Sequence, residues 1–290
     1  MSTPTRTRGL VLGGGGITGI AWETGLLTGL AEAGVDLTTA DRVIGTSAGS
    51  IVGSQITSDT PLDELYRRQL LPPGHPDGPT ETTLASIGPR VLATFGFALL
   101  RARGDVEAFG RILGRRAVRT TAQGRTPSIA ERYDQVRQRL TTTTWPDRDL
   151  VITAVDVETG TLVAFKPGHD VGLEDAVNAS CAVPCVYPPI PINGRTYVDG
   201  GMRSGSNSDL AAGCDPVVAL TPSDRSIGPL RTASQQLAEL GVAHLVITPD
   251  EGSLSAIGKN VLDPAARPAS ARAGHAQAAA YAERVREIWG

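Results

Sequence analysis

The sequence predicts an α/β fold of three layers, in which helices cover both faces of a mainly parallel central sheet. The first 57 residues alternate strand, glycine-rich turn and helix twice, an order typical of a parallel sheet flanked by helices. Two later apolar runs, 217–220 and 244–247, repeat the strand pattern on either side of a helical stretch near 232–240. With 290 residues, 40% of them hydrophobic, the chain is long enough for one large domain over 1–290.

The first strands and helices are predicted from short apolar runs that end in glycine. The run 8–12 predicts a buried strand, because four consecutive glycines close it with a tight turn. Apolar residues then recur at helical spacing from Ile17 onward, and Gly34 is a typical helix stop. A second strand at 42–44 leads through a glycine-rich turn into a second helix.

Residues 60–145 differ in character and predict a helical insertion that caps the site. A Pro-Pro-Gly run at 72–74 breaks the chain before them. Amphipathic stretches follow at 84–100, 106–118 and 129–140, and their spacing predicts helices that cover the sheet.

Hairpins and a closing helix are predicted for the second half of the chain. The turn Thr159-Gly160 separates strand signals at 150–155 and 161–165. Asn193-Gly194, between two short apolar runs, is the strongest short hairpin signal in the sequence. The expected parts of the domain are a sheet core (5–57 and 146–250), a helical insertion (60–145) and an Ala-rich C-terminal helix (265–289).

Composition and charge exclude several functional classes. Lys+Arg 27 against Asp+Glu 30 gives a net charge of -3, which argues against a general nucleic-acid binder. Three cysteines provide no four-ligand zinc set, so we expect no metal and interpret the cysteines as buried apolar residues. The polar segment 1–8 lacks the apolar core of a signal peptide, and no apolar run approaches the roughly 20 residues of a membrane span. We therefore expect a cytoplasmic protein.

A Gly-x-Ser-x-Gly motif at 45–49 lies between a predicted strand and a predicted helix. That position is the context of a nucleophile elbow, in which a serine on a strained turn projects clear of the sheet. Gly45 and Gly49 remove the Cβ atoms that would clash in such a turn. The following helix directs its N-terminus at the site and favours negative charge there. Ser47 is therefore the candidate nucleophile.

A glycine loop follows the first predicted strand and admits two interpretations. Gly14, Gly16 and Gly19 form a GxGxxG pattern, which occurs in dinucleotide-binding sites. The same loop suits an oxyanion hole, whose backbone amides stabilise a tetrahedral intermediate. A dinucleotide site needs an acidic residue at the end of the second strand, but that strand runs into Ser47. The sequence favours the oxyanion hole.

A nucleophilic serine needs a base, and the sequence offers Asp199 more readily than a histidine. None of His75, His169, His244 and His275 lies in a motif typical of a triad member. Asp199 follows a predicted strand and precedes two glycines, which places its carboxylate on a tight loop at a strand end. An ordinary turn acid is the alternative interpretation of that position.

The three motifs together resemble those of the patatin-like phospholipase family, which combines a GGGxxG loop, a GxSxG serine and a DGG or DGA aspartate. Here the motifs are residues 14–19, 45–49 and 199–201, in the family's order. The run 179–184 and the Tyr-Pro-Pro that follows it are also similar to the family's approach to its aspartate. The resemblance covers about 8–57 and 150–222.

The resemblance implies a Ser–Asp dyad without cofactor, in which Ser47 is the nucleophile and Asp199 the general base. The family usually has Lys or Arg before the last glycine of the loop, whereas this chain has Thr18. The implied oxyanion loop uses main-chain amides, with supporting glycines in the other two motifs: Gly14, Gly15, Gly16 and Gly19 in the loop, and Gly45, Gly49, Gly200 and Gly201 around Ser47 and Asp199.

The resemblance also implies an acyl lipid or other ester as substrate, and the charge balance leads us to expect no nucleic acid as partner. Between 101 and 140 the sequence has ten arginines and four acidic residues, a local charge of +6. This block suits peripheral contact with membrane lipid, and a solvated helical cap is the simpler interpretation. A general small-ester carboxylesterase and a non-catalytic lipid- or nucleotide-binding module are the alternative functions.

Overall fold

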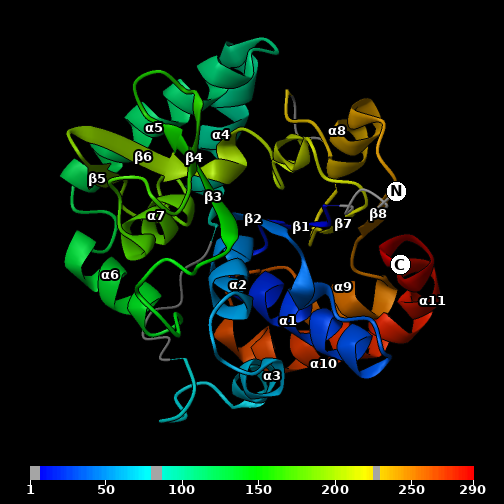
Figure 1. Ribbon diagram of the computed structural model, residues 1–290. Coiled ribbons are helices and arrows are strands. Elements are labelled where there is room, and N and C mark those ends of the chain that lie inside the picture. The colour runs from blue at the N-terminus through cyan, green and yellow to red at the C-terminus, as the bar shows by residue number, and fades with distance from the viewer. Residues whose placement is uncertain (1–6, 80–86, 225–228) are drawn as a thin grey trace.

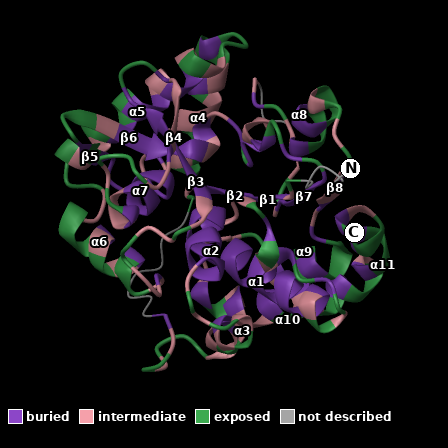
Figure 2. Ribbon diagram, viewed as in Figure 1, coloured by how far each residue is buried: buried purple, intermediate pink, exposed green. Residues whose placement is uncertain are grey.

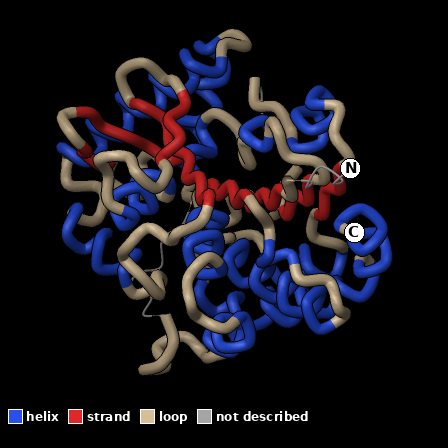
Figure 3. The backbone as a smooth tube through the Cα atoms, viewed as in Figure 1, coloured by secondary structure: helices blue, strands red, loops and turns tan. Residues whose placement is uncertain are grey.

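A central sheet divides the protein into layers, as Figures 1 and 3 show. The computed structural model describes residues 7–79, 87–224 and 229–290. The strand order is β5-β6-β3-β2-β1-β7-β8, and β4 pairs with β3 beside this path. The strands are β1 (Gly9–Leu12), β2 (Arg42–Thr46), β3 (Asp149–Asp156), β4 (Leu162–Phe165), β5 (Ile190–Ile192), β6 (Arg195–Asp199), β7 (Val217–Leu220) and β8 (His244–Ile247).

The sheet is mixed but mainly parallel, which confirms the predicted fold class. β3, β2, β1, β7 and β8 run parallel to one another, and β1 lies at the centre of this set. β4, β5 and β6 add antiparallel pairs at the β3 end. The parallel strands are buried on both faces and therefore consist of continuous apolar runs such as Gly9–Leu12.

Helices cover both faces of the sheet (Figure 1). α1, α2 and α10 pack together on one face, and α4 and α5 lie on the opposite face. Figure 2 shows α1 and α2 almost entirely buried at the centre. The helices are α1 (Gly16–Glu32), α2 (Ala48–Ile56), α3 (Leu62–Leu70), α4 (Pro89–Ala102), α5 (Val106–Ala122), α6 (Ile129–Arg137), α7 (Leu173–Ser180), α8 (Ala233–Leu240), α9 (Glu251–Ile257), α10 (Arg267–Gln277) and α11 (Ala282–Trp289).

Both predicted hairpins are present. β3 and β4 pair antiparallel across Thr159-Gly160, and β5 and β6 pair across Asn193-Gly194. Asn193 and Gly194 both have positive φ, 47° and 76°, as the two central residues of a type I′ turn require. The turn sequence therefore determines the register that carries Asp199 to the end of β6.

The insertion at 60–145 is helical as predicted, but its helices divide between the two faces of the sheet. α3 packs on α1 and α10, α4 packs on α5, and α6 packs on α7. Part of the predicted stretch 84–100 lies outside the described residues, and the observed helix α4 starts at Pro89. A proline at the first helical position is favourable there, because it has no amide hydrogen to satisfy.

The prediction of one C-terminal helix over 265–289 was wrong. α10 ends at Gln277, a 3-10 turn follows, and α11 begins at Ala282. The bend lets Val285 and Trp289 enter the core, where they are 0% and 7% exposed. Burying these two apolar side chains stabilises the bent arrangement. That gain exceeds the helical propensity of the Ala-rich sequence, which favours a straight helix.

No helix in the described ranges combines the length and apolar character needed to cross a bilayer.

Candidate active site

The ends of two strands, β2 and β6, bring the predicted site residues Ser47 and Asp199 together on either side of β3. β2 ends at Thr46, which pairs with Thr153 in the middle of β3. The next residue of β3, Ala154, pairs with Asp199, the last residue of β6. Ser47 follows Thr46 directly, so Ser47 and Asp199 lie at neighbouring rows of the sheet with only β3 between their strands. Two residues far apart in the sequence therefore meet at one edge.

Ser47 occupies a strained turn between β2 and α2. Its backbone has φ 53° and ψ -115°, a conformation that residues other than glycine rarely adopt. The turn is tight because α2 packs directly on the end of β1: a Cβ added to Gly49 would lie 2.1 Å from the carbonyl oxygen of Leu12. Ser47 is partly exposed.

Neighbouring polar groups hold the main chain of Ser47 in this conformation. Its amide donates to Oγ of Ser180 at 2.9 Å, and its carbonyl oxygen accepts from Oγ of Ser50 at 2.6 Å. The thiol of Cys181 donates to the same carbonyl oxygen at 3.2 Å. The end of α7 therefore positions the elbow, a role that the sequence did not reveal although the family resemblance included this run.

The glycine loop lies beside the elbow. A Cβ added to Gly14 would lie 3.5 Å from Cβ of Ser47, so the loop borders the serine side chain. Gly14, Gly15 and Gly16 are partly exposed, whereas Gly19 is buried inside α1. Gly16 has φ +62°, which suits glycine and turns the chain into α1.

Only some of the predicted amides are available to an oxyanion. The amide of Gly14 donates to the carbonyl oxygen of Gly205 at 2.8 Å, and that of Gly19 to Gly15 at 2.9 Å. The amides of Gly15 and Gly16 donate to no acceptor within the described residues. The amide of Ala48, at the first position of α2, also donates to no acceptor among the described residues. The sequence did not predict Ala48 as an oxyanion donor. The candidate oxyanion hole therefore consists of Gly15, Gly16 and Ala48.

Thr18, where the family usually has a cationic residue, faces the protein interior. Its side chain is 0% exposed, and its hydroxyl donates to the carbonyl oxygen of Val261 at 3.3 Å. Its amide also donates to that oxygen. A long cationic side chain would not fit this arrangement, so position 18 anchors the loop to the segment before α10.

Asp199 is a buried carboxylate whose pKa is raised to about 6. Burial, which leaves the residue 2% exposed, is the dominant cause. The Ser47 side chain, the Gly201 amide and the charge of Arg132 each lower the pKa in part. Oδ1 accepts from the Gly201 amide at 2.7 Å, whereas Oδ2 accepts no well-formed hydrogen bond within the described residues. The interaction with Ser47 is therefore loose, as is common before substrate binds.

Arg132 contributes a buried positive charge that the sequence did not reveal. It comes from α6, is 2% exposed, and stacks 3.8 Å over the ring of Tyr187. Its Nη2 donates to the carbonyl oxygen of Cys181 at 3.1 Å. No described carboxylate forms an ion pair with it, and Asp199 is the acidic residue whose pKa it lowers. Nothing in the arginine-rich sequence around it distinguishes this arginine from the others.

A buried hydrogen-bond network connects the strand ends that carry Ser47 and Asp199. Nδ2 of Asn207 donates to Oγ1 of Thr46 at 3.1 Å, to Oγ1 of Thr153 at 3.3 Å and to the carbonyl oxygen of Gly200 at 3.3 Å. The two threonine hydroxyls also bond each other at 2.8 Å. Asn207 therefore ties the residue before Ser47 to the residue after Asp199. No local sequence signal marks Asn207.

A second buried carboxyl group lies near the glycine loop. Glu23 of α1 is 0% exposed, and burial raises its pKa well above the usual range. The Gly13 backbone lowers that pKa in part. These conditions favour the neutral acid, in contrast with Asp199, whose pKa is near neutrality.

The histidines take no part in the site. His275 bonds Glu32 at 2.8 Å and stacks on Tyr66, and His244 bonds the carbonyl oxygen of Val242. No hydrogen bond joins Ser47 or Asp199 to a histidine in the part of the chain that the structure describes. In that part, no cluster of His, Cys, Asp and Glu side chains could hold a metal ion.

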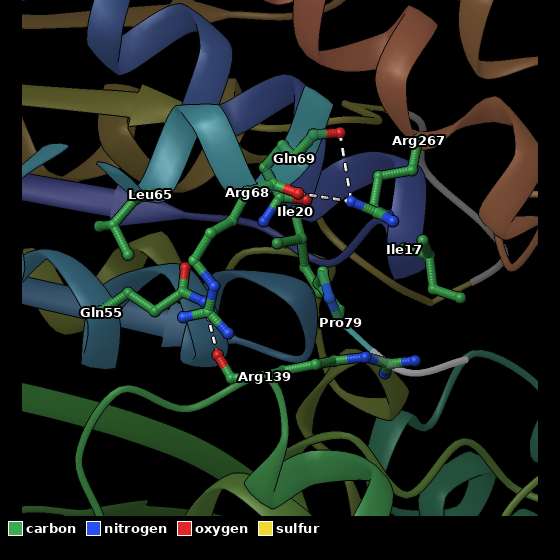
Figure 4. Close-up of a pocket in the computed structure, with 9 residues that line it drawn as sticks. All are labelled: Ile17, Ile20, Gln55, Leu65, Arg68, Gln69, Pro79, Arg139 and Arg267. Atoms are coloured by element: carbon green, nitrogen blue, oxygen red, sulfur yellow. Dashed lines mark hydrogen bonds between the residues drawn. The ribbon is translucent and has the colours of Figure 1, made fainter. Parts of the chain in front are cut away.

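A small enclosed cavity beside the first turn of α1 is not a substrate site. Its volume is about 10 Å³, which is enough for about one water molecule. Figure 4 shows Gln55 donating to the carbonyl oxygen of Arg139, and Arg267 donating to the carbonyl oxygens of Arg68 and Gln69. The Arg267 side chain at this cavity therefore makes structural contacts with the main chain.

Residues 10–212 match the family model described as Patatin-like phospholipase. Among solved structures, the chain is similar to VipD from Legionella pneumophila, with a TM-score of 0.48, 14% identity, and coverage of 98% of this chain and 68% of that chain. It is also similar to the type III effector protein ExoU, with a TM-score of 0.42, 16% identity, and coverage of 98% of this chain and 54% of that chain. The chain thus spans about half the length of ExoU. No curated protein matches the chain.

Proposed function

This chain belongs to the patatin-like phospholipase family, and from that premise we propose that it hydrolyses carboxylic esters of lipids through a dyad of Ser47 and Asp199. The family supports lipid acyl hydrolysis in general. The observation that carries the specific proposal is the sheet register, which sets Asp199 beside a serine in a nucleophile elbow. The raised pKa of Asp199, about 6, suits a general base that works near neutral pH.

The first half of the reaction acylates the serine. Asp199 accepts the hydroxyl proton of Ser47 as Ser47 Oγ attacks the ester carbonyl carbon. The amides of Gly15, Gly16 and Ala48 stabilise the oxyanion, and each good donor contributes roughly 3 kcal/mol to the transition state. α1 begins at Gly16 and α2 at Ala48, so the positive ends of both helix dipoles would favour negative charge at these amides. The C–O bond then breaks, and the leaving alcohol takes the proton from Asp199.

The second half releases the fatty acid. Water attacks the acyl-serine carbonyl and gives its proton to Asp199, and the same amides stabilise the second oxyanion. The acyl–serine bond breaks, and Ser47 recovers the proton that Asp199 holds. Serine and aspartate thus return to their starting states after one ester has been hydrolysed.

Labelling with a fluorophosphonate tests the nucleophile directly. We expect a fluorophosphonate probe to modify the protein at Ser47, as located by peptide mapping, and Ser47→Ala to abolish both labelling and hydrolysis of a nitrophenyl ester. Ser54→Ala is the matched control, since Ser54 lies on the same helix with its hydroxyl bonded to the carbonyl oxygen of Ser50. Robust ester turnover by the Ser47→Ala protein would refute the proposal.

A phospholipid assay tests the substrate class separately. Turnover of a short nitrophenyl ester depends on the dyad, whereas release of fatty acid from phosphatidylcholine also requires that the site accept a lipid. Nitrophenyl ester turnover without any fatty acid release from phospholipids would assign the protein as a small-ester carboxylesterase.

A further inference from the structure

An open groove lies between α4 and α5, and neither Ser47 nor Asp199 lines it. Its volume is about 1090 Å³, which is the size of a site for an organic ligand rather than for a water molecule. Both helices belong to the insertion, and Figure 1 shows them stacked against each other on one face of the sheet. Cys185 completes the wall; it is partly exposed, so the prediction that all three cysteines are buried was wrong.

The groove gathers cationic side chains that the described part of the chain does not neutralise. No described acidic residue lines it, and none of its arginines forms an ion pair or a side-chain hydrogen bond with a described residue. All of them are exposed. The five arginines of the groove are Arg90, Arg115, Arg116, Arg119 and Arg125.

The other arginines of the same sequence block have partners or different surroundings. Arg111 pairs with Asp105 and Glu107, and Arg137 pairs with Glu174 at 2.9 Å. Arg132 is buried at the active site. The positive charge of the block at 101–140 is therefore not a uniform solvated surface, because four of its ten arginines line one groove without an ion-pair partner among the described residues.

The α4 wall adds exposed apolar side chains to this charge. Phe97 lines the groove and is 57% exposed, and Leu92 and Leu100 on the same helix are 60% and 79% exposed. The opposite side of α4 packs on α5 through Ala98 and Ala102. α4 therefore presents a second apolar surface that the described residues leave exposed, next to guanidinium groups that form no ion pair with them.

We propose that the α4–α5 groove docks the protein on the surface of an anionic phospholipid bilayer. The arginines bind lipid phosphates, which guanidinium groups recognise bidentately, while Leu92, Phe97 and Leu100 enter the acyl boundary of the interface. A polynucleotide would match the charge but would leave three large apolar side chains in water, so the combination favours a bilayer. The protein as a whole has a net charge of -3, and the groove therefore also determines which face approaches the membrane.

The groove is connected to the catalytic corner by two structural elements. α5 packs on Val198 and Met202, which flank Asp199 in sequence. The segment 181–185 begins at Cys181, which bonds the carbonyl oxygen of Ser47, and ends at Cys185 in the groove wall. Docking at the groove would hold Ser47 close to lipid esters. Only this benefit for catalysis rests on the proposed function, since membrane binding itself does not depend on ester hydrolysis.

Vesicle binding by the full chain tests the proposal. The experiment uses protein with Ser47→Ala, so that vesicles stay intact and the result does not depend on whether the dyad hydrolyses esters. We expect co-sedimentation with phosphatidylcholine vesicles that contain phosphatidylglycerol, and much weaker binding to phosphatidylcholine alone. Replacing Arg115, Arg116 and Arg119 together by Gln should weaken binding on the order of 100-fold, since each basic residue near an anionic surface contributes about fivefold. Leu100→Ser should weaken it about tenfold.

Matched controls separate docking from a general charge effect. The triple variant Arg67→Gln, Arg137→Gln and Arg286→Gln removes the same charge from exposed ion-paired sites and should retain vesicle binding. Thermal unfolding of each variant checks its fold. Equal losses in the two triple variants, or no dependence on phosphatidylglycerol, would overturn the proposal. A vesicle affinity that Leu100→Ser leaves unchanged would also overturn it. So would a result in which the groove variant alone loses RNA binding but still binds vesicles.

Discussion

The catalytic corner and the α4–α5 groove contrast in how completely their polar groups are satisfied. At the corner, the main chain of Ser47 and the side chain of Asn207 make several buried hydrogen bonds each. At the groove, five guanidinium groups have no ion-pair partner among the described residues. A satisfied network fixes geometry before substrate arrives, whereas an unsatisfied surface acquires its partners from outside the molecule.

The two regions also use arginine differently. Arg132 is buried and holds fixed contacts with Tyr187 and Cys181, so its charge acts on internal neighbours, among them Asp199. Arg116 is exposed and unpaired, so its charge acts on whatever approaches the groove. The same residue type in one sequence block thus tunes an internal group in one place and selects an external partner in another.

The largest expected effect is at the dyad. Asp199→Asn should lower kcat/KM for a nitrophenyl ester by about 10³-fold or more, because the isosteric amide cannot accept the serine proton. For the unmodified protein, kcat/KM should rise about tenfold per pH unit up to about pH 6 and then level off, since Asp199 must be ionised to act. A pH–rate profile measures this. A flat profile between pH 4.5 and 7 would contradict the assignment of Asp199 as base.

Asp199→Asn should also increase the free energy of unfolding, whereas most substitutions of buried residues decrease it. The pKa of Asp199 is raised in the folded state, so its stabilising contribution is present below about pH 4 and is lost as the pH rises through about 6. Asp199→Asn should therefore increase the free energy of unfolding above pH 6 by up to about 3 kcal/mol. Urea unfolding at pH 4 and pH 8 measures the difference. Asp134→Asn, on the exposed surface of α6, is the control and should show no such pH-dependent gain.

An intermediate effect is expected at Asn207. Removing its amide leaves buried hydroxyl and carbonyl groups unsatisfied, so Asn207→Ala should cost about 2–3 kcal/mol in unfolding free energy. It should also lower kcat about tenfold with little change in KM, because the strand ends lose their alignment. Asn178→Ala removes one bond, to the carbonyl oxygen of Glu174, and should cost less stability and leave kcat unchanged. An equal loss of kcat in both variants would exclude a positioning role.

The smallest expected effect is at Arg132. Its charge lowers the pKa of Asp199, so Arg132→Met should move the midpoint of the pH–rate profile upward. Activity should fall a few-fold near pH 6 and recover near pH 8. Arg137→Met, on the same helix but exposed, should leave the midpoint unchanged. A uniform loss of activity at every pH would indicate a structural role for Arg132 instead.

The elements that sequence predicted correctly are those with local signals. Glycine turns after apolar runs predicted β1, α1, β2 and α2, and Asn193-Gly194 predicted the hairpin of β5 and β6. The tail was predicted wrongly as one helix, because the gain from burying Trp289 depends on the position of β8 and α1 rather than on neighbours in sequence.

In the proposed site, the candidate reactive groups could be named from the sequence and the supporting groups could not. Ser47 and Asp199 are each followed by a turn with its own motif, so each could be named from a few residues. The amide of Gly14 was predicted as an oxyanion donor, yet it is already bonded to Gly205. That bond depends on the path of a loop more than 150 residues away, which no local pattern describes.

The sequence by itself determined the succession of strands and helices and the choice of Ser47 and Asp199 as candidate reactive side chains, because each depends on backbone preferences within a few residues. The tertiary structure decided the pKa of Asp199, the choice of Arg132 as its cationic neighbour, and the division of the arginines between core and groove. These properties depend on burial and on distances between segments, and both are established only when the sheet has assembled.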